Sequence, residues 1–407
     1  MFVIPKTMQA VVYRGINDLR LETVPVPRIG PDELLVKVAA CGVCPTDIKK
    51  IQYGLVAPPR IFGHETAGTI VRVGGRVRGF KLGDRVALHH HVPCLTCHAC
   101  RHRAFAQCAT YKKTGITAGF EPAGGGYAEY VRVMSFVLSG VVKIPRRNSF
   151  LEGAMLEPVN TVLKAVNRLE LLKGDSVLVA GQGPIGLMFT RILALRGMKV
   201  LATDLLDARL TLAHEFGAEW TRNVGDGDLT AKYAKHAKAD KGSTAELTPP
   251  GFSHSLSSGE RARVRASHTT DTEKGAHVRT SSFQLSTFNF QRTGLDAAII
   301  AVPSDEVVRE AQELVRGGGK VLLFSHTKRG EEMPMDLARI CVDEKDLIGS
   351  YSADFLLQKE VAKLVFSRRL DTRKLITHQF RLEQTAEAIA LASKPTPDAL
   401  KVVVVPG

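Results

Sequence analysis

The first third of the chain alternates short apolar runs with glycine, proline and aspartate. Between Gln9 and about Val142 these runs are a few residues long and rich in valine, as in AVVY, LLVKVAA, GTIVRV and AEYVRV. Short β-branched runs bounded by turn residues are typical of strands. The pattern predicts a strand-rich domain with many turns.

From about Leu163 the pattern changes to an alternation of helices and strands. TVLKAVNRL has helical spacing, SVLVAG and KVLATD have the composition of buried strands, and IGLMFTRILALRG between these strands is helical. The alternation continues in LDAAIIAV, EVVREAQELV and KVLLFS. We therefore predict an α/β chain whose middle part is a parallel, doubly wound sheet.

After Gly330 the sequence predicts a mixture of helices and strands. It ends in a run with helical spacing, QTAEAIALAS, and a predicted strand, LKVVVV. We expect a catalytic domain built from both chain ends, residues 1–158 and 328–407, with a nucleotide-binding domain at 159–327 inserted between them. Residues 238–292 are rich in Ser, Thr, Gly and Arg without periodicity, over a length unusual for a loop. We expect a surface insertion there, largely without defined structure; an error in the gene model would look the same.

Length and charge narrow the class of protein. The 407 residues suffice for two ordinary domains, and the mean hydropathy of −0.01 is typical of globular proteins. No apolar run approaches the length of ~20 residues that is needed to cross a bilayer. The sequence also lacks a signal-peptide pattern, and we therefore expect a cytoplasmic protein. The net charge of +14 is spread along the chain, which favours attraction of an anionic cofactor over nucleic-acid binding.

A glycine motif marks the expected cofactor site. Gly181, Gly183 and Gly186, with Pro184 and Ile185 between the last two, follow a predicted strand and open a predicted helix. Glycines at this place permit a tight turn, close approach of the backbone to a pyrophosphate, and close packing of helix on strand. The motif therefore predicts dinucleotide binding.

The end of the next strand bears on the choice of cofactor. Asp204 stands there, where a carboxylate accepts hydrogen bonds from the adenosine ribose and repels a 2′-phosphate, so we predict NAD rather than NADP. Capping of the following helix is the other interpretation of Asp204. Arg209 on the first turn of that helix could accept a phosphate, cover the adenine or pair with Asp204.

Two groups of residues have the composition of zinc sites. Four cysteines lie close together in one segment, and four thiolates leave a zinc ion no open position, so we predict a structural zinc site. These cysteines are Cys94, Cys97, Cys100 and Cys108. Cys44, His64 and Glu65 supply a thiolate, an imidazole and a carboxylate, which together would make an open zinc site able to admit a substrate.

The order of these motifs resembles a known family. His64-Glu65 after glycine, then Gly68, Gly74, GDRV and the four-cysteine segment are similar to the zinc-containing alcohol dehydrogenases of the medium-chain dehydrogenase/reductase superfamily. The resemblance covers nearly the whole chain except the insertion. It implies a GroES-like catalytic domain, a Rossmann domain, two zinc ions per chain, NAD, and a homotetramer or homodimer.

Within that superfamily, Glu157 followed by Pro158 and Val159 resembles the sorbitol and threonine dehydrogenase branch. There a glutamate approaches the zinc directly or through water. The resemblance implies Cys44 and His64 as ligands of the catalytic zinc, with Glu65 and Glu157 sharing the remaining direct or water-mediated roles. For Glu157, a salt-bridged carboxylate at a helix start is the other interpretation.

The resemblance also implies roles around the zinc. Thr46 matches the hydroxyl that takes the alcohol proton, and Asp47 matches the carboxylate that orients the zinc-binding histidine. Lys49 stands where many relatives have the histidine that ends the proton relay, so the last transfer would use water or the cofactor ribose. His90 aligns with a pocket position that is often apolar, which would favour a polar substrate. Thr46 could instead be an ordinary turn or capping residue, and Asp47 could be a solvent-facing helix N-cap. His90 could lie on the surface or serve as a spare metal ligand.

The implied activity is hydride transfer between a secondary alcohol or polyol and NAD, with zinc polarising the alcohol. An enzyme similar to L-threonine 3-dehydrogenase is the nearest alternative. A non-catalytic zinc- or nucleic-acid-binding scaffold is the alternative from another class. We expect a small-molecule substrate and neither nucleic acid nor membrane as a partner.

Overall fold

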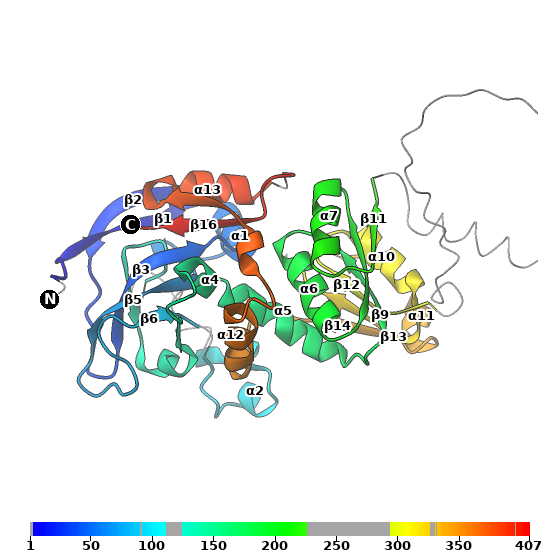
Figure 1. Cartoon of the computed structure of the whole chain (residues 1–407), viewed down its shortest axis with the longest axis horizontal. Coiled ribbons are helices and arrows are strands. Elements are labelled where there is room, and N and C mark those ends of the chain that lie inside the picture. Colours follow the sequence, from blue (N-terminus) through cyan, green and yellow to red (C-terminus); the bar gives the residue numbers. More distant parts are fainter. Residues whose placement is uncertain are drawn as a thin grey trace, which may run out of the picture.

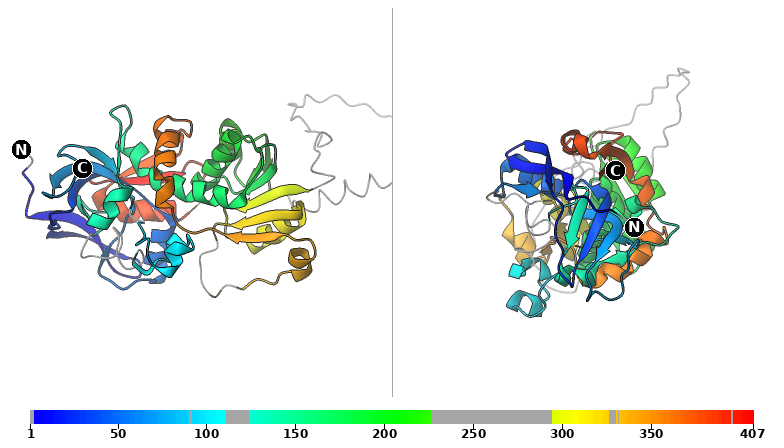
Figure 2. Two further views of the ribbon diagram at one scale, coloured as in Figure 1. Left: turned by 90° about the horizontal axis from the view of Figure 1, so that it is seen from below. Right: turned by 90° about the vertical axis from the view of Figure 1, so that its left-hand side faces the viewer.

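The protein forms two lobes that lie side by side, with both chain ends in the same lobe (Figures 1 and 2). The structure is a computed structural model that describes residues 3–89, 92–110, 124–225, 294–325, 330, 332–394 and 396–407. The predicted insertion at 238–292 and His90 lie outside the described residues. None of the helices that the structure describes is both long and apolar enough to cross a membrane.

The lobe that holds the chain ends contains two sheets. The three-stranded sheet has the order β2 (Asp18–Pro25), β1 (Thr7–Gly15), β4 (Arg60–Ile61). The seven-stranded sheet has the order β15 (Ile376–Arg381), β16 (Lys401–Val405), β3 (Leu34–Gly42), β5 (Glu65–Val73), β6 (Arg85–Ala87), β8 (Val142–Lys143), with β7 (Tyr130–Val133) also paired to β3. The C-terminal β16 runs antiparallel to β3, so segments from the first and last parts of the chain share one sheet.

The same lobe contains short helices. They are α1 (Pro45–Tyr53), α2 (His98–Arg101), α4 (Phe150–Ala154), α12 (Gln358–Phe366) and α13 (Thr385–Ala392). At the start of α1, the Cys44 sulfur accepts a hydrogen bond from the backbone of Thr46, and Pro45 is an early helical residue without an N–H to satisfy. Gly54 ends α1 in the left-handed conformation that favours glycine. The sequence thus fixes α1 directly beside Cys44.

The second lobe is a six-stranded parallel sheet with helices on its faces, as the sequence predicts. The strand order is β11 (Trp220–Asn223), β10 (Lys199–Asp204), β9 (Ser176–Ala180), β12 (Leu295–Ile300), β13 (Val315–Leu323), β14 (Asp346–Gly349). The helices are α6 (Pro184–Leu195), α7 (Asp207–Glu215), α10 (Asp305–Leu314) and α11 (Leu337–Cys341). Because β14 pairs with β13, the parallel sheet continues beyond residue 327, and we propose a domain boundary near residue 350.

Helix α5 (Leu156–Leu169) connects the cores of the two lobes. One cluster of buried side chains includes Ala67 of β5, Leu163 and Val166 of α5, and Val179 of β9. A continuous apolar core resists sliding of one lobe against the other, because every shift would open voids. The packing around α5 therefore fixes the position of the space between the lobes.

Candidate active site and zinc centres

A cavity between the lobes brings the predicted metal and cofactor residues together. Its volume of about 380 Å³ is within the usual range of small-molecule sites. The lining includes Cys44, Thr46, Lys49, His64, Glu65, Glu157, Lys401, Gly183, Pro184, Ile185, Gly186 and Ser325. Both halves of the predicted site thus open into one space.

Three predicted ligands converge at one wall of this cavity. Cys44 caps α1, His64 precedes β5, and Glu65 is the first residue of β5. Their sulfur, ring-nitrogen and carboxylate atoms all lie within 4.8 Å of one another. A thiolate, an imidazole and a carboxylate at this spacing fit a zinc ion with room for one more ligand.

Asp47 holds the imidazole of His64. The carboxylate is fully buried, and its Oδ2 and Oδ1 lie 3.0 and 3.1 Å from Nδ1 of His64. Although burial lowers the pKa of His64, Asp47 and Cys44 raise it well above its usual value. Asp47 is therefore not a solvent-facing cap. Because Asp47 engages Nδ1 of His64, Nε2 is the ring nitrogen that would bind a metal.

Glu157 lies in the first turn of α5 and faces the same cavity. It is only 5% exposed, and burial, together with repulsion from Glu65, raises its pKa to about 7. Among the described residues, it is not part of the tight group formed by Cys44, His64 and Glu65. The geometry thus brings Glu65 closer to the other two ligands than Glu157.

Lys401, the first residue of β16, is a site residue that the sequence reasoning missed. Its ammonium nitrogen lies 2.6 and 2.5 Å from the two carboxylate oxygens of Glu65 and donates to the Val43 carbonyl at 2.9 Å. Burial lowers the pKa of Lys401, but Glu65 and Cys44 raise it above its usual value, so the side chain is charged. The only sequence signal was a lysine at the start of an apolar strand.

Two further predicted residues line the cavity from α1. The backbone N–H of Thr46 donates to the Cys44 sulfur at 3.4 Å, and Thr46 itself lines the cavity. Lys49 reaches across to the second lobe and donates to the carbonyl of Ser325 at 3.3 Å. This lysine therefore connects the two walls of the cavity.

The glycine motif has the predicted strand–turn–helix geometry. Gly181 has a φ of +91°, which favours glycine, and a Cβ on Gly186 would lie 1.7 Å from the Gly181 carbonyl oxygen. A Cβ on Gly183 would meet open space, and Pro184 begins α6 directly after it. The N-terminus of α6 is thus open to the cavity, where its free N–H groups can bind a phosphate.

Asp204 and Arg209 lie at the end of β10 and the start of α7. The Asp204 carboxylate accepts from the backbone of Gln182 at 2.6 Å and of Leu206 at 3.0 Å. Leu206, rather than Asp204, occupies the N-cap of α7. Arg209 lies 3.9 Å from Asp204 and also donates to the carbonyls of Thr396 and Ala399 at 3.2 and 3.3 Å.

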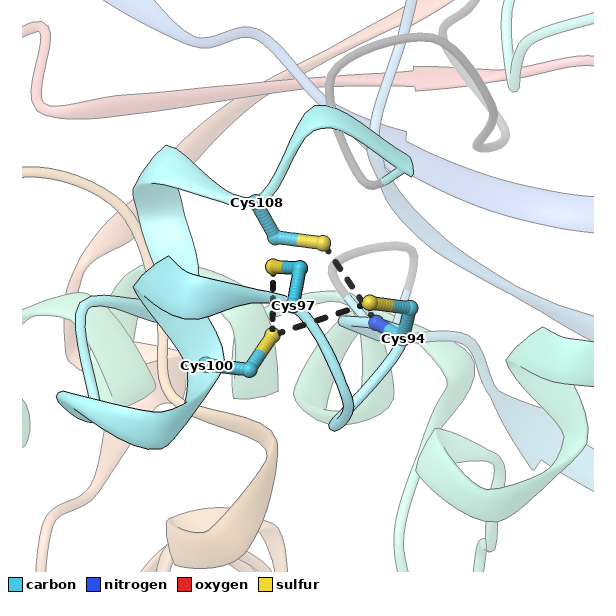
Figure 3. Close-up of side chains that lie close together, drawn as sticks. All are labelled: Cys94, Cys97, Cys100 and Cys108. Carbon is cyan, nitrogen blue, oxygen red and sulfur yellow. Dashed lines mark hydrogen bonds between the residues drawn. The ribbon is translucent and has the colours of Figure 1, made fainter.

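The four cysteines of the second predicted metal site point toward one another (Figure 3). Their sulfur atoms lie within 4.8 Å, with 3.4 Å between Cys97 and Cys100 and 4.0 Å between Cys94 and Cys100. A tetrahedron of sulfur atoms about 2.3 Å from zinc needs them roughly 3.8 Å apart. Hydrogen bonds from Thr96 and Cys97 lower the pKa of Cys94 to about 5, whereas burial raises that of Cys100 to about 12. The arrangement fits a closed structural zinc site.

Comparisons with known proteins agree with this geometry. Residues 30–146 match the alcohol dehydrogenase GroES-like domain, and residues 184–367 match the zinc-binding dehydrogenase model. A sorbitol dehydrogenase from Bacillus subtilis is 28% identical over 99% of this chain and 98% of its own. A sorbitol dehydrogenase from Bos taurus is 33% identical over 60% of this chain and 68% of its own.

A solved structure has the same fold. A zinc-binding dehydrogenase from Sinorhizobium meliloti 1021, solved bound to NADP, superposes with a TM-score of 0.77 at 24% identity, covering 99% of this chain and all of that one. The chain therefore belongs to the zinc-containing alcohol dehydrogenases of the medium-chain dehydrogenase/reductase superfamily. It is an oxidoreductase with a GroES-like domain and a Rossmann domain, as the sequence predicts.

Proposed function

We propose that this enzyme transfers hydride between a secondary alcohol or polyol and NAD, at a zinc ion held by Cys44 and His64 with Glu65 and Glu157 in the remaining roles. One observation carries the proposal: the group of Cys44, His64 and Glu65 and the open N-terminus of α6 line the same cavity. That arrangement would bring a zinc ion and a nicotinamide cofactor within reach of one substrate. The sorbitol dehydrogenase relatives favour a polyol.

The chain's own residues would position the substrate and move its proton. When bound, zinc supplies a Lewis acid that lowers the pKa of the alcohol. Asp47 orients His64, and the Thr46 hydroxyl is the proposed acceptor of the alcohol proton. Lys49 occupies the place of the relay histidine, so the proton would leave through water or the cofactor ribose near Lys49. His90 remains a proposed pocket residue.

For the cofactor, we propose NAD on Gly181, Gly183 and Gly186, with Pro184 and Ile185 at the start of α6. The carboxylate of Asp204 would accept from the ribose hydroxyls. Arg209 is held by Asp204 and two carbonyl groups, which disfavours its use for a 2′-phosphate. The relative solved with NADP makes this choice worth measuring.

We propose a homotetramer or homodimer in the cytoplasm. Strand β14 is an edge of the parallel sheet, and its Leu347 is 38% exposed. An exposed edge strand offers unpaired backbone groups to a second chain.

The test is NADH absorbance with a panel of polyols, simple secondary alcohols and L-threonine, with His64→Ala as the inactive control. We expect turnover with polyols or secondary alcohols. Turnover with L-threonine alone would replace the proposed substrate class by the alternative one. Zinc-loaded protein that oxidises no member of the panel would contradict the proposed activity.

A further inference from the structure

The side chains of Lys401 and Glu65 meet next to Gly42, which has no side chain. Gly42, the last residue of β3, lies opposite Glu65 of β5 on one side and Val403 of β16 on the other. A Cβ on Gly42 would lie 1.9 Å from the Glu65 carboxylate and 3.0 Å from the Lys401 side chain. The sheet therefore has a gap at Gly42 through which the lysine reaches the carboxylate.

Lys401 contacts both segments that carry the proposed zinc ligands. It binds Glu65, which follows His64, and it donates to the carbonyl of Val43, which precedes Cys44. Lys401 and Glu65 are 5% and 1% exposed. A charged pair this deep is retained only when each charge has a close partner, so the ammonium and carboxylate are firmly coupled.

This pairing affects what Glu65 can give a metal. A carboxylate whose charge is already balanced by an ammonium group attracts a second cation less strongly than a free carboxylate does. We propose that Lys401 is a positioning residue that holds Glu65 and limits how strongly Glu65 binds the catalytic zinc. This inference rests on the proposed function. The zinc is then kept mainly by Cys44 and His64, with a weak carboxylate ligand that a substrate can displace.

The test is the rate at which the holoenzyme loses its zinc to a fixed excess of chelator. Lys401→Met removes the charge at similar length, Lys401→Gln keeps a hydrogen-bond donor, and Lys401→Arg keeps the charge. We expect both neutral variants to release catalytic-site zinc about tenfold more slowly, a size typical of changes around zinc ligands. The arginine variant should behave like the parent.

A double-mutant cycle separates this role from general packing. In a Glu65→Gln background, Lys401→Gln should leave the rate of zinc loss unchanged, because Lys401 acts through the Glu65 carboxylate. Unchanged or faster zinc loss in both neutral single variants, or an equal effect of Lys401→Gln with and without Glu65, would overturn the inference. A parent that binds zinc only at the four cysteines would overturn the proposed function as well, whereas an active parent with two zinc ions isolates the role of Lys401.

Discussion

Nδ1 of His64 lies 3.0 Å from the buried carboxylate of Asp47. Because Asp47 fixes the ring, Asp47→Ala should weaken zinc binding by about 10- to 100-fold, as is usual for such partners, and lower kcat/KM with it. Zinc retention during dialysis and steady-state kinetics check this prediction. Asp32→Ala is the control, because Asp32 forms an exposed ion pair with Arg76 and neither residue lines the cavity. Zinc retention equal to the parent's would contradict the role of Asp47.

The two zinc sites should respond differently to loss of a ligand. Cys97→Ser should lower the yield and the melting temperature, because a closed zinc site contributes to folding. Cys44→Ser should leave the melting temperature nearly unchanged and abolish turnover. Thermal unfolding and elemental zinc analysis of both variants distinguish these effects, with two zinc ions expected in the parent. Equal thermal destabilisation by both substitutions would contradict the assignment of one site as structural and the other as catalytic.

Cofactor choice is tested at Asp204. Two charge-assisted hydrogen bonds to a ribose, with repulsion of a 2′-phosphate, correspond to about 2 to 4 kcal/mol, or roughly 30- to 1000-fold preference for NAD. Asp204→Ala and the closer analogue Asp204→Asn should both reduce the ratio of kcat/KM for NAD over NADP. Equal efficiencies in the parent, or an unchanged ratio in both variants, would exclude Asp204 as the ribose-binding carboxylate.

The environment of the Glu152 carboxylate should make the stability of the protein depend on pH. The buried carboxylate accepts from the backbone of Ser149 at 2.7 Å, from Asn148 at 2.8 Å and from Arg368 at 3.0 Å. Burial raises the pKa of Glu152, but Arg368, Ser149 and Asn148 together bring it below the ordinary value of 4.5. A lowered folded-state pKa means that this stabilisation is present above pH 4.5 and is lost as the pH falls through the folded-state value.

Glu152→Gln should therefore lower the free energy of unfolding by about 1 to 3 kcal/mol at pH 7, and the deficit should shrink below pH 4.5. Urea unfolding of the parent and the variant at several pH values measures this difference in the free energy of unfolding. Glu383→Gln, at an exposed position, is the control. A deficit that grows on acidification would have the wrong sign for this account.

Local signals in the sequence predicted much of the fold and the site. The glycine turn, the four-cysteine segment and the alternating strands each depend on residues that are near in the chain. Lys401 was missed because its partner Glu65 is 336 positions away, and the two meet only because β16 and β5 both pair with β3. Strand β14 was missed because four residues, DLIG, are too few to show a period. The alternative for Asp47, a solvent-facing helix cap, was wrong because the carboxylate is buried against His64, 17 positions away.

The central claim is that zinc at Cys44 and His64 supports oxidation of an alcohol by NAD. The most direct measurement follows NADH formation from the best polyol of the panel while zinc is removed by a chelator and then restored, with zinc content determined at each step. The account predicts that activity falls in proportion to the zinc lost from this site and returns when zinc is added back. Full turnover by protein that retains only the zinc of the four cysteines would contradict it.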